Sequence, residues 1–131
     1  MDPQTLPIDS KNGSIRSDLG LITRQALFGT SGRTDVLVLV AGLGRSFPSE
    51  LSRLTGLPKT TVLRTLAGFE RAGVLVSTEL ANAREVRLNP DYVAARELRV
   101  LLEALIEREP RYRALLTQAS RRRPRRSGKP L

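Results

Sequence analysis

A cation, two hydroxyl groups and a second cation follow one another at helical spacing between residues 59 and 64. In a helix, Lys59, Thr60 and Arg64 face outward. Val62 and Leu66, four residues apart, then form the inner apolar face. A guanidinium can donate two hydrogen bonds to a guanine edge, whereas ammonium and hydroxyl groups suit phosphate oxygens. These residue types therefore predict contacts to double-stranded DNA, with Arg64 reading a base and Lys59 holding a phosphate or a guanine.

The same segment and the hairpin predicted after it supply further candidates for DNA binding. Ser77 to Leu88 is expected to form a two-stranded wing, with Asn82 at its tip adopting positive φ. The wing carries few cations, and Glu79 and Glu85 would repel DNA if they faced it. The complete set of predicted DNA-binding residues is Lys59, Thr60, Thr61, Leu63, Arg64, Arg84 and Arg87.

The elements that position these residues are marked by glycines and apolar spacing over residues 48–76. Leu51 and Leu54 give a first helix its buried stripe. Gly56 follows where the chain must turn with positive φ, and a recognition helix is predicted over 59–72. Gly73 ends that helix before a strand. Helix, turn, helix and strand in this order predict a winged helix-turn-helix, whose second helix enters the major groove.

Two known groups of regulators resemble this pattern. Leu57-Pro58-Lys59-Thr60-Thr61-Val62 is similar to the recognition segment of IclR-type regulators. The wider frame, with Leu27-Phe28-Gly29 before it and Arg87-Leu88-Asn89-Pro90 after it, resembles ArsR-type compact winged helices. The resemblance covers about residues 20–108 and leaves no room for an IclR effector domain. It implies a transcriptional regulator that binds DNA.

The whole pattern predicts a mainly α fold with a small β-wing, a winged helix-turn-helix with an additional C-terminal helix. Helices are also expected at Leu19–Phe28, at Thr34–Leu43, and from Tyr92 to about Ala119 with a break at Pro110. We expect three parts: a flexible arm over 1–17, the winged-helix domain over 18–119 and a disordered basic tail over 120–131.

The segment Val36–Val40 has two interpretations. Its continuous, β-branched apolar residues favour a buried strand by local propensity. Gly42-Leu43-Gly44 would then resemble a dinucleotide-binding turn, but Phe47 occupies the third glycine position. A strand would also leave the two-helix motif without its supporting helix, so we predict a helix.

Composition narrows the class of protein. The 131 residues include no cysteine and no histidine, so we expect no disulfide, no metal sensing of the ArsR kind and no cofactor. Without these side chains an enzyme is also not expected. No run of apolar residues approaches membrane-spanning length and the N-terminus lacks signal-peptide features, which predicts a cytoplasmic protein without membrane contact. The sequence identifies no small-molecule effector.

Charge is concentrated at the C-terminus. Residues 111–131 contain eight Lys or Arg and no acid, whereas residues 1–110 hold 14 basic and 13 acidic residues, a net charge of +1. The Arg-rich tail is either a solvated, disordered segment or an arm that holds phosphates without reading sequence.

The helix after the wing carries more apolar residues than a compact winged helix needs. They recur at helical spacing and are Ala94, Leu98, Leu101, Leu102, Leu105 and Ile106. Either they all cover the domain's own core, or some form a homodimer interface, which we prefer. The alternative function is a protein-interaction adaptor whose Arg-rich tail binds RNA or an acidic partner.

Overall fold

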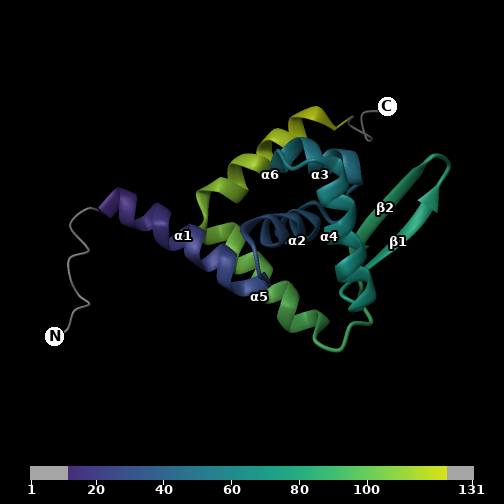
Figure 1. Cartoon of the computed structure of the whole chain (residues 1–131), viewed down its shortest axis with the longest axis horizontal. Helices are drawn as coiled ribbons and strands as arrows, with labels where there is room; N and C mark the ends of the chain where they lie inside the picture. The colour runs from purple at the N-terminus through teal and green to yellow at the C-terminus, as the bar shows by residue number, and fades with distance from the viewer. Residues whose placement is uncertain (1–11, 124–131) are drawn as a thin grey trace, which may run out of the picture. The chain divides into compact units, whose positions relative to one another are not determined.

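The structure is a computed structural model that describes residues 12–123 (Figure 1). The chain divides into two compact units, Met1–Thr34 and Asp35–Leu131, and each is described by itself. In chain order the elements are α1 (Asn12–Phe28), α2 (Ser31–Leu43), α3 (Pro48–Thr55), α4 (Lys59–Arg71), β1 (Leu75–Leu80), β2 (Ala83–Leu88), α5 (Ala95–Arg108) and α6 (Pro110–Arg122).

The first unit is built around α1. This helix begins at Asn12 rather than at the predicted Leu19, so the predicted N-terminal arm is helical in its described part. It ends as predicted at Gly29, whose φ of 101° belongs to the left-handed region that glycine adopts without steric cost. Residues 1–11 of the expected arm lie outside the described residues.

Val36–Val40 lies in α2, so the prediction of a helix is confirmed and the strand interpretation is wrong. These five side chains are at most 1% exposed. A helix enclosed by protein on all sides is apolar all round and loses the periodicity that would identify it in the sequence. Burial in the core thus overrides the β propensity of the valines.

The winged helix-turn-helix follows as predicted. In the wing, β1 and β2 pair antiparallel, from Leu75 opposite Leu88 to Leu80 opposite Ala83. The connecting loop is therefore the pair Ala81 and Asn82. The residue with positive φ is Ala81, at 52°, and not Asn82 as predicted. Positive φ at only the first of two loop residues is the pattern of a type II′ turn, one of the two turns that commonly join antiparallel strands.

The predicted helical break at Pro110 is confirmed, since α5 ends at Arg108 and α6 begins at Pro110. Glu109 between them is extended, as expected before a proline. The first helix begins at Ala95 instead of Tyr92. The second extends past the predicted end at Ala119 to Arg122, and therefore includes the start of the expected disordered tail.

A polar cluster inside the second unit joins α2 to α6. Asp35, only 4% exposed, accepts a hydrogen bond from the hydroxyl of the fully buried Tyr112 at 2.6 Å. The guanidinium of Arg111 lies 2.8 Å from the other carboxylate oxygen. A buried carboxylate needs such partners to offset the loss of water. The cluster thus holds α6 beside the core helix.

Candidate nucleic-acid interface

The turn between α3 and α4 has the geometry that the sequence predicts. Gly56 adopts φ of 80°, and its N–H donates to the Ser52 carbonyl at 2.9 Å. The Ser52 hydroxyl donates to the Leu57 carbonyl at 2.7 Å, so this small side chain holds the turn to the preceding helix. These contacts set the direction in which α4 leaves the turn.

The predicted recognition helix, α4, separates buried from outward residues as expected. Val62 and Leu66 are fully buried. Lys59, Thr60 and Arg64 are exposed, whereas Thr61 and Leu63 are half-buried at the edges of the outward face. Neither Lys59 nor Arg64 forms a hydrogen bond or ion pair with any described residue. Both cations are therefore available to an external anion.

Arg71 was not among the predicted DNA-binding residues. It is exposed at the end of α4, seven residues after Arg64 and so on the same face. Like Arg64, it has no partner among the described residues. The helical spacing from Arg64 was visible in the sequence and could have identified it. The outward face of α4 thus carries three cations, counting Lys59.

The wing arginines are engaged within the protein. The Arg84 Nη2 atom lies 2.6 and 2.7 Å from the two carboxylate oxygens of Glu70 on α4, and its Nε atom donates to the Ser77 hydroxyl at 3.3 Å. Arg87 is exposed and donates to the Thr78 hydroxyl at 3.2 Å. Arg84 was predicted to reach phosphate or the minor groove, but in this structure its charge is paired with Glu70.

A second ion pair joins the end of α6 to the start of α3. Glu50 is 7% exposed and binds Arg123 through both carboxylate oxygens, at 2.6 and 2.8 Å. The Ser46 hydroxyl donates to the same carboxylate at 2.6 Å. Burial alone would raise the pKa of Glu50, but the hydrogen bonds from Arg123 and Ser46 outweigh it and lower that pKa below its usual value. Sequence reasoning missed this pair, because its members lie 73 residues apart.

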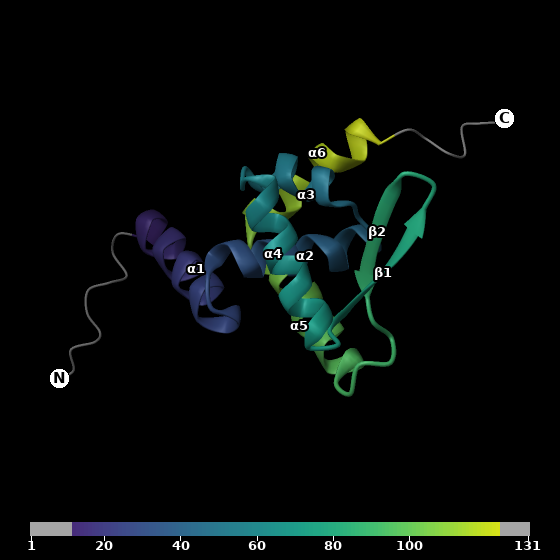
Figure 2. The same ribbon diagram turned by 45° about the vertical axis from the view of Figure 1, so that its right-hand side comes forward.

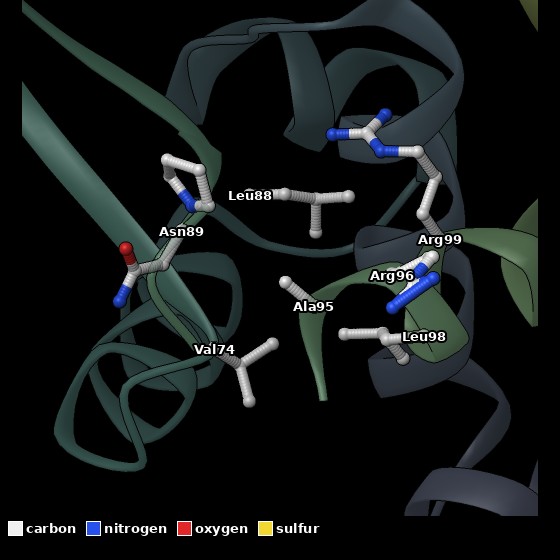
Figure 3. A pocket seen from close by; sticks show the side chains of 8 residues that line it. Val74, Leu88, Asn89, Ala95, Arg96, Leu98 and Arg99 are labelled. Atoms are coloured by element: carbon white, nitrogen blue, oxygen red, sulfur yellow. The ribbon is translucent and has the colours of Figure 1, made fainter. Parts of the chain in front are cut away.

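A cavity of about 260 Å³ lies beside the base of the wing (Figure 3). Val74, Leu88 and Leu98 point toward it, and Arg96 and Arg99 stand at its α5 side. It therefore separates the ends of the wing from the first turns of α5. In the described part of the chain, no group of three or more acidic residues is placed to hold a metal ion.

No single helix among the described residues has both the length and the apolar content to cross a membrane. The required length and apolar content are reached only when two helical segments are taken together, Gly20–Phe28 and Ser31–Leu43. The second of these helices contains the fully buried segment 36–40.

Comparison with known proteins identifies related helix-turn-helix domains. Residues 34–79 match the family model of the IclR helix-turn-helix domain. No curated protein matches the chain. A solved structure of a mutant MarR protein from E. coli is similar, with a TM-score of 0.55 and 14% identity over 88% of this chain and 87% of that chain. At this identity the likeness is one of fold.

The predicted winged helix-turn-helix is thus confirmed, together with the resemblance to IclR-type regulators. The match to the IclR helix-turn-helix model supports a DNA-binding transcription regulator as the class of protein. The resemblance of the wider frame to ArsR-type proteins stays a prediction.

Proposed function

We propose that this winged helix-turn-helix protein is a sequence-specific, dimeric transcriptional regulator that inserts α4 into the major groove of double-stranded DNA. The observation that carries the proposal is the state of Arg64. Its side chain is exposed, without a partner among the described residues, and opposite the buried Val62 and Leu66. An exposed arginine without a partner in the protein is suited to bidentate binding of a guanine edge.

The other residues of α4 position the helix on the DNA. Lys59 and Thr60 lie in its first turn, where they suit a phosphate or a nearby base, and Arg71 extends the cationic face to its end. Thr61 and Leu63 border this face and suit a phosphate and a thymine methyl group, respectively. Arg87 supplies a cation from the wing, and Arg84 does so once it leaves Glu70.

The homodimer is proposed to form through α5. Val100 and Leu101 are 61% and 39% exposed, whereas Leu102 is fully buried and belongs to the core. The apolar stripe predicted from the sequence is thus divided between the core and an outward face. Two-fold symmetry would place the half-sites about one helical turn, roughly 10 base pairs, apart on the operator.

The test of this function is a selection of binding sites from random duplex DNA. Arg64→Ala is expected to weaken specific binding by about 1–3 kcal/mol and to relax the preference at one base position. Lys59→Ala, which removes a phosphate contact, should weaken all sequences similarly. If the Arg64→Ala variant selects the same base sequence as the wild type, Arg64 does not read a base. If the wild type selects no preferred sequence, the proposed function is contradicted.

A role on chromosomal DNA implies a cytoplasmic protein. We further propose that it is not an enzyme and binds no cofactor, because its sequence has neither cysteine nor histidine to act as a nucleophile or a base near neutral pH.

A further inference from the structure

The last turn of α6 is fixed to the helix-turn-helix through Arg123. Its Nε and Nη2 atoms donate to the two carboxylate oxygens of Glu50, at 2.8 and 2.6 Å. The Nη2 atom also donates to the Arg45 carbonyl at 2.8 Å. A planar guanidinium bound at both carboxylate oxygens has a defined orientation. The chain therefore leaves α6 at a fixed point beside α3.

This connection is stronger than an ordinary surface ion pair. The Glu50 side chain is 9% exposed and that of Arg123 is 29% exposed, so water screens the pair only in part. The Ser46 hydroxyl completes the hydrogen bonding of the carboxylate. Ser46 is itself held to the wing, since its backbone pairs with Val86 of β2. One buried carboxylate thus joins α6 to α3 and to a segment that pairs with the wing.

The residues around Arg123 have a strongly basic character. No acidic residue occurs in α6 or after it. Arg121 and Arg122 are exposed and have no partner among the described residues. Beyond the described residues, the sequence adds three further cations, Arg125, Arg126 and Lys129. Arg121 and Arg122 therefore form a basic surface at the end of α6 that has no counter-ion among the described residues.

The location of this basic surface matches that of the DNA-binding elements. Figures 1 and 2 both show the end of α6 beside α3, at the end of the unit where α4 begins and toward which the wing extends. A duplex bound by α4 would bring its phosphates to the same end.

We propose that the end of α6, with Arg121 and Arg122, is a second DNA-binding surface that holds backbone phosphates next to the site read by α4, and that the Glu50–Arg123 pair positions it. The proposal rests on the proposed function. The sequence alone allows the basic C-terminus to be either a solvated tail or a phosphate-binding arm. The proposal favours the phosphate-binding arm and places its start at the end of α6. Arg123 acts here as a positioning residue, because its own charge is neutralised by Glu50.

The substitution Glu50→Gln separates positioning from charge. It removes a negative charge, so simple electrostatics predicts tighter binding to any duplex. Loss of positioning predicts the opposite, with weaker binding to a duplex of mixed sequence. If both arginines lose their phosphates, the salt slope should flatten by up to about 1.8, at roughly 0.9 per contact. The loss of affinity between about 50 and 200 mM salt should then be roughly tenfold smaller.

A second pair of variants keeps the net charge constant. Arg123→Lys retains the cation but not the two-point geometry. Arg108→Lys makes the same change at an exposed residue at the end of α5, which lies outside the proposed surface and has no described partner. Arg123→Lys should lower affinity for the mixed duplex and flatten the salt slope, and Arg108→Lys should leave both near wild-type values. Circular dichroism of each variant separates these effects from loss of folding.

Unchanged affinity and salt slope in folded Arg123→Lys would overturn the proposal, as would tighter binding by folded Glu50→Gln. The proposal would also be overturned if Arg123→Lys weakened binding to a single-stranded RNA of mixed sequence but not to the duplex. Any of these results together with loss of base preference in Arg64→Ala would leave the proposed function intact.

Discussion

Arg84 of the wing and Glu70 of α4 form an ion pair in which one guanidinium nitrogen lies 2.6 and 2.7 Å from the two carboxylate oxygens. Both side chains are partly buried. The pair connects β2 to the last turns of α4. It also neutralises one of the two wing cations predicted to bind DNA. In this structure Arg84 could therefore bind a phosphate only after leaving Glu70.

Glu70→Gln should release Arg84 and strengthen binding to duplex DNA. We expect the affinity to rise a few-fold and the salt slope to steepen by about 0.9, the effect of one additional phosphate contact. The control is Glu79→Gln, which removes the same charge from an exposed wing residue without a described partner. Equal salt slopes for the two variants, measured by fluorescence anisotropy, would show that Arg84 does not bind phosphate.

Gly68→Ala should stabilise the protein. Gly68 lies in the interior of α4, its φ is not positive, and a methyl group there would meet nothing within 4 Å. Alanine is favoured over glycine in a helix by up to about 1 kcal/mol, so the free energy of unfolding should rise by about that amount. Gly44→Ala is the matched control, since it also has free space but a φ of 84°, and it should destabilise. Urea unfolding measures both, and a lower stability for Gly68→Ala would contradict the prediction.

Leu101→Asp should dissociate the proposed homodimer without unfolding the monomer. Leu101 is 39% exposed in the single chain, so a carboxylate is tolerated there but not in an apolar interface. Sedimentation should give a folded monomer with reduced affinity for a two-half-site operator. Leu102→Ala provides the contrast. Leu102 is fully buried, so truncating its side chain should lower the free energy of unfolding by about 2–5 kcal/mol. Wild-type protein that is monomeric at micromolar concentration would refute the dimer.

Local signals in the sequence were sufficient to predict the helix-turn-helix. Gly56 and Gly73 have φ of 80° and 82°, as their positions at the ends of two helices predict. Val62 and Leu66 are buried as their spacing indicates. Each of these features depends on residues within a few positions of one another. The position of the positive φ in the wing loop was predicted incorrectly, since its choice of Ala81 over Asn82 depends on strand register.

Contacts between distant segments could not be predicted in the same way. Asp35 binds Arg111 and Tyr112 of α6, and Glu50 binds Arg123. In each case the partners are more than 70 residues apart in the sequence. Nothing near Glu50 indicates that it will be buried or which of the many C-terminal arginines will bind it. We therefore predicted that Arg123 belongs to a disordered tail, whereas in the structure it follows α6 directly, as its C-cap, and binds Glu50 of α3.

The Glu50–Arg123 pair should also set part of the acid sensitivity of the fold. Hydrogen bonds from Arg123 and Ser46 hold the pKa of Glu50 below its ordinary value of 4.5 in the folded state. Its contribution to the free energy of unfolding is therefore complete above about pH 4.5 and is lost as the pH falls through the lower, folded-state pKa. Glu50→Gln has no carboxylate to protonate there, so its stability should be lower at neutral pH and should fall less steeply in acid. Glu103→Gln, at an exposed site without a described partner, is the control and should follow the wild type. Urea unfolding from neutral pH to about pH 3 measures these curves, and a Glu50→Gln curve parallel to the wild type would show that this carboxylate does not stabilise the fold through its charge.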